Sequence, residues 1–116
     1  MDKKLLDKIE NSLEITFYEW QREYLLNKPM YDFDLRITGR GTGKTLAWAI
    51  RQLFESDEPL DFRTETEVRR QCDWWSVGTT YEGLRHHPYI HWYRRYVIDI
   101  KDKLNAKGIK TREIIL

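Results

Sequence analysis

A glycine-rich stretch at residues 38–45 constrains this chain more than any other part of its sequence. It reads Thr-Gly-Arg-Gly-Thr-Gly-Lys-Thr and nearly matches the P-loop (Walker A) pattern G-x-x-x-x-G-K-[ST], with Thr38 where the first glycine is expected. Glycines at alternate positions let the backbone adopt positive φ angles and turn its N–H groups toward a phosphate. We therefore predict a phosphate-binding loop formed by Gly39, Arg40, Gly41, Thr42, Gly43, Lys44 and Thr45.

The segments on both sides of this loop fit the same interpretation. Residues 33–38 alternate between apolar and polar side chains, as a strand does, and residues 46–54 carry apolar side chains at helical spacing. The N-terminus of that helix adds its dipole and free N–H groups beneath the phosphates. We expect Lys44 to reach the β- and γ-phosphates and the Thr45 hydroxyl to bind Mg²⁺. The alternative is a flexible glycine-rich turn that contains Gly-Lys-Thr by chance.

The rest of the chain alternates between predicted helices and strands. The apolar spacing predicts helices over 2–14 and from a capping box at Thr16 and Glu19 to Pro29. One or two helical turns follow at 64–72, after a polar, proline-containing connection at 56–62. We further expect a strand at 74–79, a long helix from Pro88 to near Gly108, and a strand at 111–116. This alternation predicts an α/β fold with a short, mostly parallel sheet.

Composition indicates one folded domain. The chain has 116 residues, of which 41% are hydrophobic and 14% aromatic, and no apolar run approaches the roughly 18 residues of a membrane span. Its only cysteine, Cys72, rules out an internal disulfide and suits a reducing compartment. We therefore expect a cytoplasmic protein that makes no contact with a membrane.

The net charge of +1 conceals a division of the chain. Residues 1–83 hold 12 Lys/Arg against 16 Asp/Glu, a balance of −4, and residues 84–116 hold 8 against 3, a balance of +5. Aromatic and histidine side chains are interleaved in the basic part, which is what a nucleic-acid partner would require. The alternative is a solvated helix face that covers the core.

Three short motifs together resemble the ATPase domain of phage terminase large subunits, the DNA-packaging motors. They are Trp20-Gln21, Arg40 through Thr45, and Val77-Gly78-Thr79-Thr80-Tyr81-Glu82. The resemblance covers most of residues 16–116, and related helicase-type ATPases share the plan. It implies an abbreviated, P-loop NTPase-like, three-layer αβα domain over 1–116, with N-terminal helices in 1–30, a strand, loop and helix in 33–56, and a strand, basic helix and strand in 73–116.

The resemblance also assigns roles to single residues. It implies that Gln21 contacts adenine, that Arg40 faces the γ-phosphate beside Lys44 as a catalytic group, and that Thr80 couples the nucleotide site to DNA. ATP and Mg²⁺ are the implied cofactors. The implied partners are double-stranded DNA, bound through residues 85–112, and other phage or host proteins in a bacterial cytoplasm. On their residue types alone, Gln21 also fits a solvated helix position and Arg40 a surface loop.

The acidic Walker B strand of that family is not found in the sequence. The segment Tyr96-Val97-Ile98-Asp99 is a rival, but Val97 continues a helical stripe, so we expect Asp99 to point into water. The chain is then either the front part of a larger motor or a small stand-alone relative. The alternative function is that of a regulatory or interaction protein that binds nucleotide without hydrolysis.

A zinc site is the remaining possibility that the sequence raises. His87 and His91 are four residues apart, and His86 and Cys72 are further potential ligands. Structural zinc sites usually show paired ligands at both ends, which a lone cysteine does not provide. We expect packing or phosphate-facing roles for these histidines.

Overall fold

The computed structural model describes residues 1–27, 43–74 and 80–116, and helices dominate these parts. The elements, in chain order, are α1 (Lys3–Leu13), α2 (Glu19–Asn27), α4 (Lys44–Phe54), β1 (Leu60–Asp61), α5 (Glu65–Gln71), the 3-10 helix η3 (Glu82–Leu84), α6 (Pro88–Ala106) and β2 (Ile114–Ile115). No described helix has both the length and the apolar character that a membrane crossing requires.

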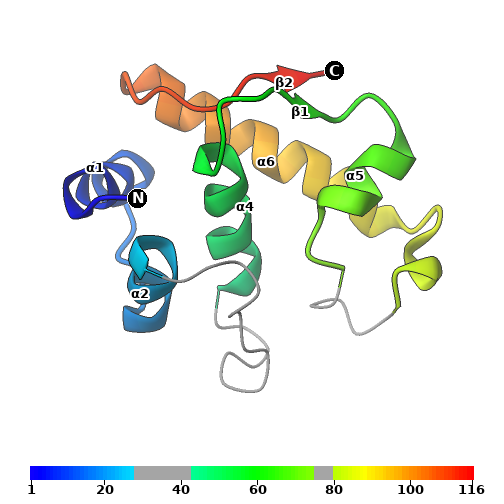
Figure 1. Cartoon of the computed structure of the whole chain (residues 1–116), viewed down its shortest axis with the longest axis horizontal. Coiled ribbons are helices and arrows are strands. Elements are labelled where there is room, and N and C mark those ends of the chain that lie inside the picture. The colour runs from blue at the N-terminus through cyan, green and yellow to red at the C-terminus, as the bar shows by residue number, and fades with distance from the viewer. Residues whose placement is uncertain (28–42, 75–79) are drawn as a thin grey trace.

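Helix α4, which follows the predicted P-loop, is the central element of this structure (Figure 1). It packs against α2 on one side and against α6, which also contacts α1 and α5. Its buried residues include Ala47, Ile50 and Leu53, which fall at helical spacing. The helix predicted after the loop is therefore confirmed, and it forms part of the core because most of its side chains from Ala47 to Leu53 are buried.

Helix α1 confirms the first predicted helix. Asp2 caps its N-terminus, since the side-chain Oδ1 accepts a hydrogen bond from the Leu5 N–H at 2.7 Å. Leu6 and Ile9, three residues apart, are its buried side chains. The predicted helices over 64–72 and from Pro88 are likewise confirmed as α5 and α6.

Helix α2 begins later than the capping box predicts. Its first residue is Glu19, and the N–H of Tyr18 donates to Oε1 of Gln21 at 2.8 Å. The Phe17 N–H instead donates to the Glu10 carboxylate at 2.8 Å, a contact from α1 that holds the chain outside the helix. The box predicted at Thr16 and Glu19 is therefore wrong, and Gln21 supplies the acceptor three residues after Tyr18.

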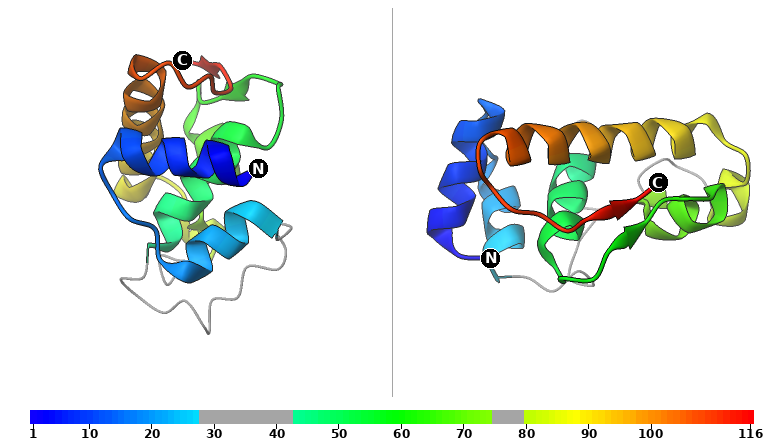
Figure 2. Two further views of the ribbon diagram at one scale, coloured as in Figure 1. Left: turned by 90° about the vertical axis from the view of Figure 1, so that its left-hand side faces the viewer. Right: turned by 90° about the horizontal axis from the view of Figure 1, so that it is seen from above.

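A two-stranded parallel sheet joins distant parts of the chain (Figure 2). Leu60 pairs with Ile114 and Asp61 with Ile115, so the strand predicted within 111–116 is confirmed in its central part. Its partner lies in the segment 56–62, which we predicted to be a connection only. That prediction is wrong because Leu60 and Phe62 are both buried, at 1% exposure, and their N–H groups donate to Glu113 and Ile115.

These elements show a mostly helical α/β chain with parallel strand pairing. The strand predicted at 33–38 lies outside the described residues. So does nearly all of the strand predicted at 74–79, of which Trp74 alone is described.

Candidate functional site

The described part of the P-loop is its last three residues, at the start of α4. Gly43 precedes the helix with φ +82°, a left-handed conformation that favours glycine, and no side chain of a described residue caps this end. Lys44 is the first helical residue, and its ammonium group contacts no acceptor among the residues that the structure describes. Uncapped N–H groups and an unpaired lysine at a helix N-terminus are suited to an anion.

Gln21 holds this end of the loop against α2. Its Nε2 donates to the Gly43 carbonyl at 2.9 Å, while its Oε1 accepts from Tyr18, and the side chain is buried at 2% exposure. Sequence reasoning singled out Gln21 for a different task, contact with adenine, and that role stays a prediction. In the described geometry its amide links the start of α2 to the start of α4.

Gly43→Ala tests this link. A Cβ at this position would lie 2.3 Å from the Nε2 of Gln21, in addition to the strain of a positive φ. We expect the free energy of unfolding to fall by about 1–3 kcal/mol from backbone strain alone, and by more because of the clash. Gly108→Ala is the matched control, because Gly108 has φ +83° and nothing within 4 Å of an added Cβ.

Urea unfolding of four variants separates the two effects. In a Gln21→Ala background, Gly43→Ala should be no more destabilising than Gly108→Ala, because the clashing amide is gone. If Gly43→Ala and Gly108→Ala are equally destabilising with Gln21 present, the close approach of Gln21 to Gly43 is refuted.

Thr45, the last P-loop residue, is hydrogen bonded to a buried carboxylate. Its Oγ1 donates to Oδ2 of Asp73 at 2.7 Å, and Asp73 is 1% exposed. The hydroxyl of Tyr89, in the first turn of α6, donates to the other carboxylate oxygen and lies 3.4 Å from the Thr45 Oγ1. One carboxylate therefore joins the start of α4 to the start of α6.

The C-terminal end of α5 explains why Asp73 lies there. The carbonyl of Gln71 accepts hydrogen bonds from Trp48 Nε1, at 2.9 Å, and from the side chain of Gln52. Both donors belong to α4, one turn apart, so the end of α5 is fixed along that helix. Two residues further on, the chain reaches Asp73 beside Thr45, which lies one turn before Trp48.

The Asp73 carboxylate also affects Tyr93 and Tyr96 of α6. Burial raises the pKa of Tyr93 well above its ordinary value, and the negative charge of Asp73 adds to that rise. The pKa of Tyr96 is raised for the same two reasons, burial first. The Tyr93 hydroxyl stays protonated and donates to Oε1 of Gln52. The hydroxyls of Thr45 and Tyr89 thus donate directly to the buried carboxylate, whereas Tyr93 and Tyr96 are affected by its charge.

This arrangement offers two oxygen atoms of the kind that Mg²⁺ binds. Mg²⁺ prefers hard oxygen ligands and usually binds through one or two carboxylates together with phosphates. The Thr45 hydroxyl and the Asp73 carboxylate are such oxygens, and they are already in contact. Sequence reasoning missed Asp73, because the acid was sought at the end of an apolar run and Asp73 precedes the aromatic residues of a predicted strand.

Other predicted site residues are placed elsewhere or not described. Gly39, Arg40, Gly41 and Thr42 lie outside the described residues. Thr80 is exposed, and its Oγ1 accepts from the N–H of Gly83 at 3.0 Å, which caps the turn of η3. Asp99 lies on α6 and is exposed, as expected, so it does not approach Thr45.

The four potential zinc ligands separate into three environments. Cys72 is buried, its Sγ donates to the Arg69 carbonyl at 3.3 Å, and burial raises its pKa to about 12. His87 caps α6 through Nδ1 and so precedes the helix that was expected to pair it with His91. His86 and His91 both contact Glu65. No group of three metal-ligating side chains forms in the described part of the chain.

The basic segment 85–112 is partly used inside the fold. Arg94 donates to the Phe62 carbonyl, Lys101 to Asn105 and Thr111, and Arg112 to the Glu58 and Gln52 carbonyls. The exposed basic side chains of the segment are Arg85, Arg95, Lys103, Lys107 and Lys110.

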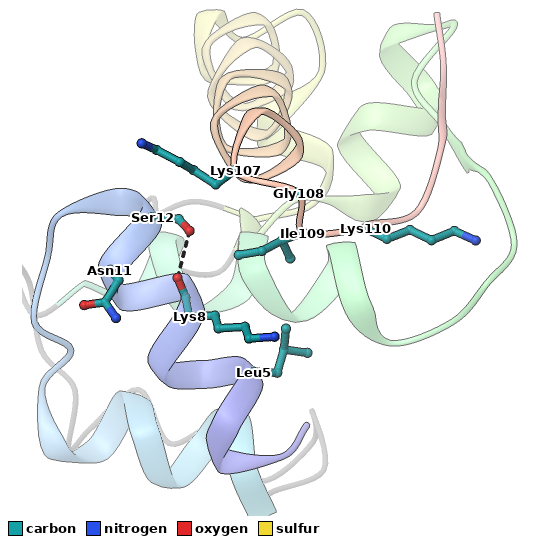
Figure 3. A pocket seen from close by; sticks show the side chains of 8 residues that line it. All are labelled: Leu5, Lys8, Asn11, Ser12, Lys107, Gly108, Ile109 and Lys110. Carbon is teal, nitrogen blue, oxygen red and sulfur yellow. Dashed lines mark hydrogen bonds between the residues drawn. The ribbon is translucent and has the colours of Figure 1, made fainter.

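A hollow of about 710 Å³ lies between α1 and the C-terminal end of α6 (Figure 3). Lys107 and Lys110 are at its edge and extend in different directions. Its walls are formed by one side of α1, from Leu5 to Ser12, and by the chain from Lys107 to Lys110, which follows α6.

Comparison of the chain with protein-family models, with curated protein sequences and with solved structures finds no match.

Proposed function

We propose that this chain binds ATP together with Mg²⁺ at the N-terminus of α4. The observation that carries the proposal is the hydrogen bond from the P-loop Thr45 to the buried carboxylate of Asp73. A chance Gly-Lys-Thr turn gives no reason for a buried acid at this hydroxyl. Among the described residues, no side chain caps this helix end and none pairs with Lys44, which supports the same conclusion.

Each residue of the proposed site has a distinct task. Lys44 and the helix N–H groups bind phosphate oxygens, and Thr45 and Asp73 hold the cation. Mg²⁺, when bound, neutralises phosphate charge. The resemblance to terminase ATPase domains adds Arg40 at the γ-phosphate, Gln21 at adenine and the three-layer αβα arrangement, and these remain parts of the proposal.

The proposed function is binding of ATP, which does not by itself imply hydrolysis of ATP. Turnover also requires a group that orients the attacking water. Among the described residues, none is assigned this task. The alternative function, nucleotide binding by a regulatory protein without turnover, therefore shares the same site, and magnesium-dependent ATPase activity of the purified chain would exclude it.

Calorimetric titration tests the proposal. We expect ATP to bind more tightly with Mg²⁺ than in EDTA, and AMP, which lacks the β- and γ-phosphates, to bind far more weakly. Equal weak heats for all three titrations would refute the proposed nucleotide site.

Contact with double-stranded DNA is a second proposal, and it depends on the five exposed cations of segment 85–112. Each neutralised phosphate contributes about −0.9 to the slope of log K against log salt concentration. We expect Lys103→Gln combined with Lys107→Gln to reduce the magnitude of that slope by about 2. Arg63→Gln, an exposed change outside the segment, is the control, and binding that does not depend on salt would contradict the proposal.

A further inference from the structure

A second, smaller hollow lies between α5 and the turn that precedes α6. Its volume is about 170 Å³, and it is lined by Glu65, Thr66, Arg69, Arg85, His86 and Ile90. Liquid water occupies about 30 Å³ per molecule, so the hollow has room for only a few water-sized groups. A nucleotide is too large for it, and a small ion is not.

Arg69, on α5, is the residue that makes this hollow unusual. It is 8% exposed, and its Nε and Nη1 atoms are buried without a hydrogen-bond partner among the residues that the structure describes. The ring of Tyr81 covers the guanidinium at 4.3 Å, and the carboxylate of Glu82 is 4.0 Å from Nη1, too far for a hydrogen bond. Arginine remains charged at all ordinary pH values, so these N–H groups require an acceptor.

Arg85 brings a further positive charge to the same hollow, and His86 lines it as well. Arg85 is exposed and forms no ion pair with any residue that the structure describes. His86 adopts φ +59°, the left-handed region that side chains rarely enter. This backbone turns its ring toward Glu65, with Nδ1 3.0 Å from the carboxylate.

The carboxylate of Glu65 lines the hollow and would repel an anion, but both of its oxygens contact histidines. His86 contacts one of its oxygens and His91 Nε2 contacts the other, at 3.1 Å. The hydrogen bond from His86 is the largest cause that lowers the pKa of Glu65. Arg69 and Arg85 thus both line the hollow, and among the described residues neither has a carboxylate within hydrogen-bond distance.

We propose that this hollow is a binding site for a small tetrahedral oxyanion, with Arg69 and Arg85 as its principal ligands and inorganic phosphate as the representative ligand. The oxygens of such an ion supply the acceptors that the Arg69 guanidinium lacks, and charge-assisted hydrogen bonds to arginine are strong. The site is separate from the proposed nucleotide site and does not depend on it.

Titration of the Lys44→Ala chain with sodium phosphate, followed by amide and arginine Nε–H resonances, tests the proposal. The Lys44→Ala background removes the P-loop lysine as a competing site, and sodium chloride at equal ionic strength is the reference. We expect saturable shifts at Arg69, Arg85 and His86 with phosphate and none with chloride. Arg85→Gln should weaken phosphate binding by about tenfold, and Arg69→Gln by at least as much.

The matched control is Arg63→Gln, which removes an exposed arginine that pairs with Asp61 outside the hollow. It should leave phosphate affinity unchanged. Because Arg69 is buried, its substitution can unfold the chain, so the Arg69→Gln result counts only if the amide spectrum is that of a folded chain. If it is not, the Arg85→Gln result alone decides the outcome. Equal shifts with chloride, or phosphate binding that Arg85→Gln leaves unchanged, would overturn the proposal. Loss of ATP binding by Lys44→Ala bears on the nucleotide site alone.

Discussion

Asp73→Asn should abolish the advantage that Mg²⁺ gives to ATP binding. The amide keeps the size of the carboxylate, and the hydroxyls of Thr45 and Tyr89 can each donate or accept, so the contacts of the site survive. The negative charge that attracts the cation is lost. We expect affinity measured with Mg²⁺ to fall by about tenfold or more, to the value measured in EDTA, because contacts with a charged group are worth about 1.5–3 kcal/mol.

Asp99→Asn is the matched control for this experiment. Asp99 is the acid that the sequence offered as a rival, and it is exposed on α6. Its variant should bind ATP as the unaltered chain does, with and without Mg²⁺. If Asp99→Asn removes the magnesium dependence and Asp73→Asn does not, the assignment of the cation site to Asp73 is wrong.

Lys44→Ala should weaken ATP binding in both the presence and the absence of Mg²⁺. In the proposed site the ammonium group contacts phosphate oxygens directly, so we expect its loss to remove charge-assisted contacts worth about 1.5–3 kcal/mol, or roughly ten- to a hundredfold in affinity. The two site variants should therefore differ in how their ATP affinity depends on Mg²⁺, since Asp73→Asn should lower the affinity only when Mg²⁺ is present.

Calorimetry of Lys44→Ala beside Lys4→Ala measures this effect. Lys4 is an exposed lysine of α1, and its removal changes the net charge by the same amount. An equal loss of affinity in both variants would show that ATP responds to the overall charge of the chain and not to the P-loop.

The elements that the sequence predicted best are those with local signals. The stripe from Ile90 to Leu104 and the apolar spacing of the first helix are set by residues a turn or so apart, and both are found in the structure. Strand β1 was missed because two residues give almost no periodicity. The start of α2 was misplaced because its position is decided by Glu10, a residue of another helix.

The residues of the candidate site also divide into those with a local sequence signal and those placed by tertiary contacts. Gly43, Lys44 and Thr45 belong to one continuous motif, which could be recognised from its spacing. Asp73 could not be recognised from the sequence, because its place beside Thr45 depends on tertiary contacts. These are the hydrogen bonds from Trp48 and Gln52 that fix the end of α5 against α4. The adenine role expected for Gln21 came from resemblance, whereas its contact with Gly43 is visible only in three dimensions.

The central claim is that ATP and Mg²⁺ bind where α4 begins. The most direct measurement is an amide-resonance titration of the isotopically labelled chain with ATP in the presence of Mg²⁺. We predict saturable shifts that are largest at Gly43, Lys44, Thr45 and Asp73, with those at Asp73 depending on Mg²⁺. An absence of shifts at these residues at millimolar ATP, or saturation confined to other parts of the chain, would contradict the account.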